Sequence, residues 1–138
     1  MSEPTQNFDD LVVGTVYPPV EYRMTAEQVG IWVEAFEDDS VPAASGGDAP
    51  LVPAALTSLY ILDAVLKAYP NRPKGNVHAK QEFVWYRPVR VGEALYTEVI
   101  VADKWIKRGR RYVQTETRTS NAAGQLVATS RMTSIFAR

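Results

Sequence analysis

Apolar residues recur at helical spacing in the first half of the chain and alternate with polar residues in the second half. The first apolar set occupies positions i, i+3, i+4 and i+7 and consists of Val29, Trp32, Val33 and Phe36. It is preceded by Thr25-Ala26-Glu27-Gln28, which has the Thr-x-x-Gln form of a capping box. These features predict a helix over about 25–37, followed by a loop at 38–50 that contains Pro and Gly.

A second helix is predicted over 53–69, because proline is favoured at the start of a helix and Pro53 stands there. Its apolar positions cover a wide sector and comprise Ala55, Leu59, Ile61, Leu62, Val65, Leu66 and Tyr69. A surface helix needs a narrower apolar stripe than this. We therefore expect this helix to be the most buried one in the protein.

From residue 78 onward the alternation has period two and the residues are rich in Val, Thr, Tyr and Trp, which is typical of β-strands. The predicted strands are His78–Tyr86, Leu95–Trp105, Arg111–Thr119 and Leu126–Phe136. The connections between them are short, so neighbouring strands should be antiparallel. One face of such a sheet must be covered, and the helix over 53–69 is available to cover it. The predicted fold class is α+β, with one domain over 1–138.

The composition excludes several classes of function. The 138 residues contain no cysteine and one histidine, which excludes disulfide scaffolds, thiolate sites and multi-histidine metal sites, so we expect no metal and no separate cofactor. The net charge of −1 and the absence of a nucleic-acid motif argue against a nucleic-acid partner. The polar N-terminal residues and the lack of a long apolar run predict a cytoplasmic protein without a membrane span.

The near-neutral total conceals two halves of opposite charge. Residues 1–69 hold 2 basic and 11 acidic residues, a formal charge of −9, whereas residues 70–138 hold 13 basic and 5 acidic residues, a formal charge of +8. Five of the basic residues lie close together around one predicted hairpin turn, namely Lys104, Lys107, Arg108, Arg110 and Arg111. This cluster permits a small polyanionic ligand or an acidic protein surface as a partner.

Several segments of the chain together carry a family resemblance. The strand segments are Phe83–Glu93, Lys107–Arg110 and Asn121–Ala128, the opening segment is Phe8–Gly14, and the start of the second helix is Leu51–Leu56. These segments resemble those of MaoC-like dehydratases and R-specific enoyl-CoA hydratases. The likeness extends over nearly the whole chain and is closest to the N-terminal, FAS-type halves of double hot-dog members. It implies a single hot-dog domain, in which a long antiparallel sheet wraps around a central buried helix preceded by a shorter helix.

The family resemblance also implies where catalysis would occur. Family members that hydrate enoyl thioesters use an Asp and a His in a motif of the form Asp-x-Asn-Pro-x-His, because water must lose one proton while the substrate carbon gains another. The matching segment here reads Asp39-Ser40-Val41-Pro42-Ala43-Ala44. It retains Asp39 as a candidate catalytic residue, but Ala44 replaces the motif histidine. We therefore expect no independent hydratase activity.

The other titratable residues offer two alternatives. His78, the sole histidine, begins a strand beyond the central helix, and the hot-dog layout does not bring it near Asp39. The loop acids Asp38, Asp39 and Asp48 would work in pairs or would be solvated carboxylates and helix caps. The sequence does not decide whether His78 or Asp48 has a catalytic role.

Two groups of residues are candidates for substrate binding. Family enzymes hold the thioester carbonyl at the N-terminus of the central helix, which here corresponds to Pro53 and Ala54, with Ala54 at a position that is usually Gly. The alternative is that these two residues merely begin a buried helix. Lys107, Arg108 and Arg110 would bind the phosphates of coenzyme A or an acidic carrier protein. Their alternative role is a solvated turn that prevents edge-to-edge aggregation.

The predicted function is a hydratase or dehydratase subunit for enoyl-CoA or 3-hydroxyacyl-CoA thioesters, in which coenzyme A forms part of the substrate. The missing histidine favours the non-catalytic half of such an enzyme. The chain would form a homodimer, or a heterodimer or heterotetramer with a catalytic hot-dog subunit. The alternatives are a hot-dog acyl-CoA thioesterase and a non-enzymatic protein that binds acyl thioesters.

Overall fold

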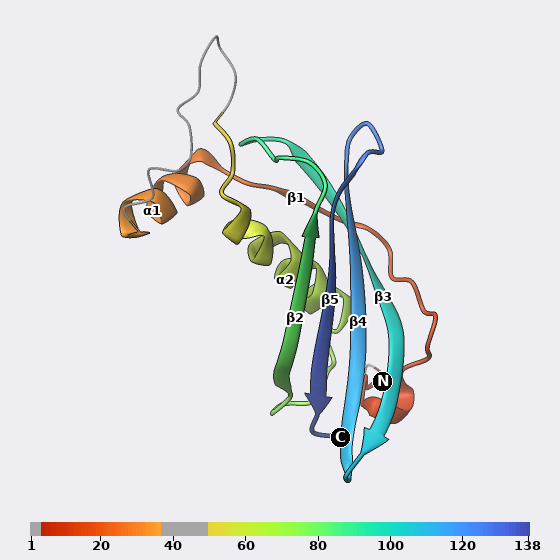
Figure 1. Cartoon of the computed structure of the whole chain (residues 1–138). Helices are drawn as coiled ribbons and strands as arrows, with labels where there is room; N and C mark the ends of the chain where they lie inside the picture. Colours follow the sequence, from red (N-terminus) through yellow and green to blue (C-terminus); the bar gives the residue numbers. More distant parts are fainter. Residues whose placement is uncertain (1–3, 37–49) are drawn as a thin grey trace.

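The computed structural model describes residues 4–36 and 50–138, which form five strands and two α-helices with two short 3-10 helices (Figure 1). The elements in chain order are η1 (Phe8–Asp10), β1 (Val20–Arg23), α1 (Ala26–Phe36), η2 (Ala54–Leu56), α2 (Thr57–Ala68), β2 (Val77–Trp85), β3 (Ala94–Lys107), β4 (Arg110–Asn121) and β5 (Leu126–Phe136). Both predicted helices and all four predicted long strands are present, with ends that differ from the predictions by at most a few residues.

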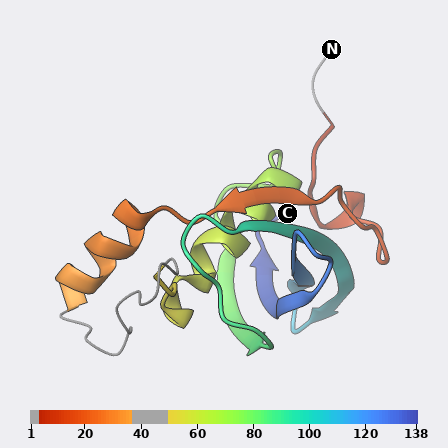
Figure 2. The same cartoon turned by 90° about the horizontal axis from the view of Figure 1, so that it is seen from above.

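The strands form one antiparallel sheet in the order β1-β3-β4-β5-β2. This arrangement confirms the predicted α+β hot-dog fold, because the sheet wraps along the central helix α2 (Figures 1 and 2). The short strand β1 was not predicted. It extends the sheet at one edge by pairing with the start of β3, from Val20 opposite Thr97 to Arg23 opposite Ala94. At the other edge, β2 has a sheet neighbour on one side only.

Helix α2 packs one face against the sheet, and this face differs in part from the predicted one. Its buried residues are Thr57, Tyr60, Ile61, Ala64, Val65 and Ala68. Leu59, Leu62 and Leu66, which we expected to be buried, are 38%, 49% and 39% exposed. They lie on the opposite side of α2 because both sides of this helix carry apolar residues, so the apolar pattern alone could not identify the side that contacts the sheet.

Hydroxyl pairs connect the strands on the face of the sheet that packs against α2. Thr97 pairs with Thr119 at 2.7 Å between hydroxyl oxygens, and Thr117 pairs with Ser130. Tyr69, which follows α2, pairs with Thr115 at 3.1 Å. All of these side chains are buried, and each hydroxyl therefore has the partner that burial demands.

Helix α1 begins with the predicted capping box. The backbone N–H of Thr25 donates to the Gln28 side chain at 2.9 Å, and the backbone N–H of Gln28 donates to the Thr25 hydroxyl at 3.1 Å. Figure 2 shows α1 standing clear of the sheet, and Ile31 and Phe36 on it are 62% and 65% exposed. Neither α1 nor any other helix of the described residues is long and apolar enough to span a membrane.

Candidate functional site

A cavity of about 330 Å³ lies where the start of α2 meets the end of β2. Its lining is mostly apolar and includes Leu51, Val52, Pro53, Ala54, Thr57, Tyr60, Trp85, Tyr86, Arg87, Pro88 and Val89. A cavity of this size, with few polar groups, is of the kind that holds a small-molecule ligand. Both residues predicted at the helix start, Pro53 and Ala54, belong to this lining.

Backbone hydrogen bonds join the two chain segments that form the cavity wall. The Val52 N–H donates to the Val89 carbonyl at 2.7 Å, and the Val91 N–H donates to the Pro50 carbonyl at 2.9 Å. These bonds fix the segment before α2 against the connection between β2 and β3. The position of the α2 N-terminus relative to the sheet is thereby set by backbone contacts rather than by side chains alone.

The first turn of the helix presents backbone donors at the cavity. The first hydrogen bond of this turn runs from the Leu56 N–H to the Pro53 carbonyl at 3.0 Å, so helical geometry leaves the N–H groups of Ala54 and Ala55 without helical partners. Ala54 is exposed, and Pro53 is buried. These N–H groups lie at the positive end of the helix dipole, where they would polarise a bound carbonyl oxygen.

Several side chains contribute polar groups to the cavity wall. The indole Nε1–H of Trp85 donates to the Thr57 hydroxyl at 2.7 Å and so links β2 to α2. Tyr60 is 1% exposed, and its hydroxyl has no hydrogen-bond partner among the described residues. Burial raises the pKa of the Tyr60 hydroxyl, an effect that the nearby Thr57 hydroxyl partly offsets, so Tyr60 remains an O–H donor at neutral pH. Arg87 is exposed and adds a positive charge to the lining.

The proposed catalytic residue Asp39 lies outside the described residues, as do Asp38, Asp48 and Ala44. His78 is described and is exposed near the start of β2, whereas the cavity contacts Trp85 at the end of that strand. At about 3.3 Å per residue, the two positions are roughly 20 Å apart. The sole histidine of this chain is therefore remote from the cavity.

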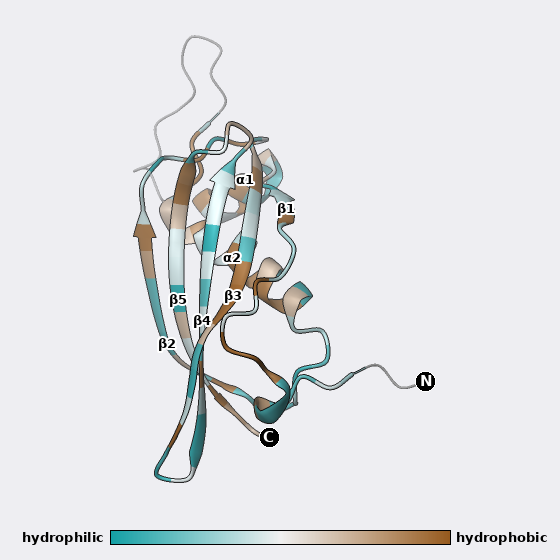
Figure 3. Ribbon diagram, turned by 90° about the vertical axis from the view of Figure 1, so that its right-hand side faces the viewer, coloured by the Kyte–Doolittle hydropathy of each residue, from teal (hydrophilic) through white to brown (hydrophobic). Residues whose placement is uncertain are grey.

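The basic hairpin is also remote from the cavity within one chain. Lys107, Arg108 and Arg110 surround the turn between β3 and β4, at the end of the sheet opposite to the start of α2 (Figure 1). The length of β3, Ala94–Lys107, separates the two ends by about 40 Å. Figure 3 shows this turn as hydrophilic. Arg108 and Gly109 have φ of 51° and 74°, as a two-residue hairpin turn of type I′ requires.

Lys104, which we grouped with the hairpin, has a structural role. Its Nζ donates to the Phe8 carbonyl at 2.8 Å and lies 4.8 Å from the centre of the Phe8 ring. It thus holds η1 against β3 and is separate from the exposed charges at the turn.

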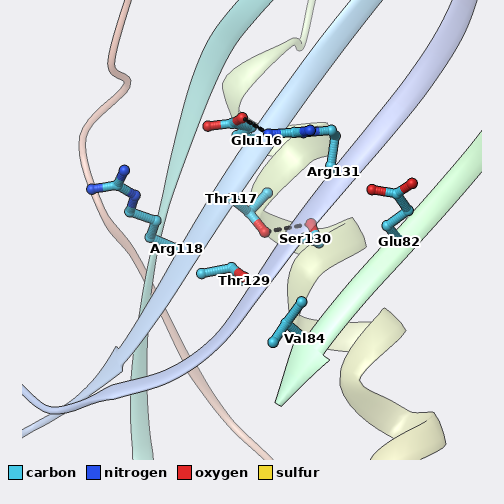
Figure 4. Close-up of a pocket in the computed structure, with 8 residues that line it drawn as sticks. All are labelled: Glu82, Val84, Glu116, Thr117, Arg118, Thr129, Ser130 and Arg131. Carbon is cyan, nitrogen blue, oxygen red and sulfur yellow. Dashed lines mark hydrogen bonds and ion pairs between the residues drawn. The ribbon is translucent and has the colours of Figure 1, made fainter. Parts of the chain in front are cut away.

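A second hollow, of about 340 Å³, is lined by residues of β2, β4 and β5. Figure 4 shows Glu116 and Arg131 on neighbouring strands joined by an ion pair, with an N–O distance of 2.8 Å. Glu82 and Arg118 also line it, so its charges balance. The hollow has no apolar wall comparable to that of the cavity beside α2. Among the described residues, no group of side chains is arranged to hold a metal ion.

The sequence interpretation missed Thr57, Tyr60 and Trp85 as cavity residues. The available signal was their spacing, since Thr57 and Tyr60 follow Ala54 at intervals of three residues along one side of the helix.

Comparison with known proteins identifies the family of this chain. A family model described as the FAS1-like, dehydratase domain region matches residues 11–130. The chain belongs to this FAS1-like dehydratase-region family. This membership, together with the hot-dog fold, confirms the predicted MaoC-like relationship. A curated relative from Saccharopolyspora erythraea, named UPF0336 protein, is 28% identical over 91% of this chain and 88% of its own length.

Solved structures share the fold of this FAS1-like dehydratase-region chain. The HadBC complex of Mycobacterium tuberculosis, a 3R-hydroxyacyl-ACP dehydratase, matches with a TM-score of 0.76 and 23% identity, covering 89% of this chain and 96% of that one. The MaoC-like dehydratase from Rhodospirillum rubrum matches with a TM-score of 0.76 and 21% identity, covering 96% and 98%.

Proposed function

We propose that this chain is a cytoplasmic subunit of a MaoC-like hydratase or dehydratase that binds enoyl-CoA or 3-hydroxyacyl-CoA thioesters and depends on a partner subunit for catalysis. The observation that carries this proposal is an apolar cavity at the N-terminus of α2, combined with a sole histidine that lies roughly 20 Å from it. The cavity has groups that would bind a thioester. The sole histidine of the chain, His78, is too far from the cavity to transfer protons there.

Binding at this cavity follows from its polar and apolar parts. The backbone N–H groups of Ala54 and Ala55 would donate to the thioester carbonyl oxygen, and the acyl group would occupy the apolar space beside Tyr60 and Trp85. Arg87 would attract the negatively charged carrier of the thioester. The partner subunit would supply the Asp and the His of the motif, and Asp39 remains a candidate catalytic residue of this chain.

The partner would cover the apolar surface that this chain leaves exposed. Leu59, Leu62 and Leu66 form an exposed stripe along α2, and Val84 and Trp85 are 49% and 50% exposed on β2. β2 also has a free edge whose backbone groups can pair with another strand. A second hot-dog chain presents both a matching edge strand and an apolar helix, and the related HadBC dehydratase is itself a complex. We therefore assign this surface to a second hot-dog subunit.

The test is hydration of an enoyl-CoA by the purified chain, alone and after addition of the hot-dog chain that copurifies with it from its native source. We expect negligible turnover by the chain alone and turnover by the complex that requires the partner's histidine. A lower turnover of the complex after Asp39→Asn in this chain would show that Asp39 takes part in catalysis. Strong hydration by the chain alone, or a strict homodimer with no partner, would contradict the proposal.

The same assays separate the two alternatives. Release of free thiol from acyl-CoA by the chain would indicate a thioesterase, because hydration leaves the thioester intact. Calorimetric binding of acyl-CoA without turnover in any assembly would indicate a binding protein.

A further inference from the structure

Exposed basic residues from two separate chain segments gather at one end of the sheet, which we call the basic end. The Ala137 N–H donates to the Asn76 side chain at 2.9 Å, and Arg111 on β4 lies opposite Phe136 on β5. Both β2 and β4 pair with β5, so their ends lie roughly 10 Å apart. The exposed bases of the basic end are Arg72 and Lys74 before β2, with Lys107, Arg108, Arg110 and Arg111 around the turn between β3 and β4.

These six bases have no acidic partner among the described residues. The ion pairs that occur there hold other bases, namely Arg23, Lys67, Lys80 and Arg131. The acids near this end are Asp9 and Asp10 in η1 and Asp103 on β3, too few to balance the bases. Like charges within about a Debye length repel one another, so a negatively charged partner would relieve the repulsion at the basic end.

Apolar and aromatic side chains lie beside these charges. Ile106, next to Lys107, is 64% exposed, and the rings of Trp105 and Tyr112 stack at 5.4 Å on neighbouring strands. Figures 1 and 3 show the turn between β3 and β4 projecting beyond the other strands. A small anionic ligand would need a concave site, whereas a projecting turn fits a broad surface.

We propose that the basic end binds an anionic lipid surface. The cations would lie against the negatively charged headgroups, and Ile106 would enter the headgroup region, where apolar side chains flanked by Lys and Arg are stabilised. A nucleic acid would use the cations alone and would leave Ile106 in water. The cavity beside α2 is at the opposite end of the sheet, so this contact does not depend on the proposed function.

The test is sedimentation of the full-length chain with vesicles of phosphatidylcholine, alone or with about one third phosphatidylserine. We expect binding to the anionic vesicles only, with an affinity that falls as salt is added. The variant Lys107→Gln, Arg108→Asn and Arg110→Gln should weaken this binding on the order of 100-fold, since each cation contributes about 5-fold. Asparagine is chosen for Arg108 because φ is 51° there, which asparagine tolerates.

Two further variants separate the parts of the contact. Ile106→Ser should weaken binding about 5-fold and leave its salt dependence unchanged, because it removes apolar area but no charge. The matched control replaces Arg23, Arg118 and Arg131 by Gln, which removes the same charge from exposed positions away from the basic end and should keep most of the binding. Circular dichroism checks that each variant is folded.

Three results would overturn the proposal. They are absence of binding to the anionic vesicles, equal binding to neutral and anionic vesicles, and equal loss in the basic-end variant and the matched control. If the chain ignores vesicles but binds duplex DNA or an acidic protein through the same three residues, the basic end takes that macromolecule and the lipid assignment is wrong.

Discussion

The indole N–H of Trp85 donates a 2.7 Å hydrogen bond to the hydroxyl of Thr57, which joins the last residue of β2 to the first turn of α2. Thr57 is 4% exposed, whereas Trp85 is 50% exposed. The two side chains also line the same cavity. The contact therefore sets the separation between the helix and the strand at the point where a ligand would enter.

Thr57→Val tests this contact, because valine keeps the shape of threonine and removes the acceptor. We expect the free energy of unfolding to fall by about 1 kcal/mol and the affinity for acyl-CoA to fall with it. Thr57→Ser keeps the hydroxyl and should retain most of the affinity. Denaturant unfolding and calorimetry measure the two effects, and equal affinity in Thr57→Val and the wild type would show that the contact does not shape the cavity.

Removal of a hydroxyl should have opposite effects at the two buried tyrosines. Tyr69→Phe leaves Thr115 without its partner and should lower the free energy of unfolding by about 1–2 kcal/mol. Tyr60→Phe removes a hydroxyl that has no partner among the described residues, so stability should stay equal or rise. Urea unfolding of the two variants in parallel checks the difference, and a large loss in Tyr60→Phe would mean that its hydroxyl is satisfied inside the protein.

Tyr69 also makes the free energy of unfolding sensitive to alkaline pH. Burial raises the pKa of Tyr69 from 10.0 to about 12, an effect that the Thr115 hydrogen bond partly offsets. The unfolded chain therefore ionises first as pH rises above 10, and stability is lost across the interval up to about 12. At pH 11 this loss should be about 1 kcal/mol larger in the wild type than in Tyr69→Phe. Urea midpoints at pH 9 and pH 11 test this prediction, and parallel losses in both proteins would contradict it.

The elements that sequence patterns predicted well are those with a local physical cause. The capping box at Thr25 and Gln28 set the start of α1, and the period-two alternation set the long strands. β1 escaped prediction because four residues, Val20–Arg23, are too few for a clear alternation, and its pairing with β3 comes from a distant part of the chain.

The candidate site was predictable only in part. Pro53 and Ala54 follow from the start of the helix, and both line the cavity. Trp85 and Tyr60 come together through the packing of a strand against a helix, which no local pattern encodes. The exposed side of α2 was mistaken for a buried one because Leu59 and Leu62 have the same apolar character as the residues that face the sheet.

The leucine stripe on α2 yields a prediction about assembly. Leu62 is 49% exposed, so Leu62→Glu should leave the fold of the chain intact but place a charge within the proposed subunit interface. We expect the complex with the partner to be lost in light scattering while the circular dichroism spectrum is retained. Val12→Glu is the control, because Val12 is 68% exposed and lies in the N-terminal segment after η1, away from α2 and the hairpin. Normal assembly of Leu62→Glu would show that this side of α2 is not the interface.

Two sets of positive charge should affect acyl-CoA binding differently. Arg87 lines the cavity, so Arg87→Gln should weaken acyl-CoA binding to the isolated chain, and the salt dependence of binding should become shallower.

Lys107, Arg108 and Arg110 lie about 40 Å away along β3, so their replacement by Ala should leave the acyl-CoA affinity of the isolated chain unchanged. We propose that these three residues act in the assembly, where they would contact the anionic carrier of a thioester held by the neighbouring subunit. The triple variant should then lower affinity only in the complex, and calorimetry on both forms checks this. Unchanged affinity in the complex would show that the hairpin charges do not contact the carrier.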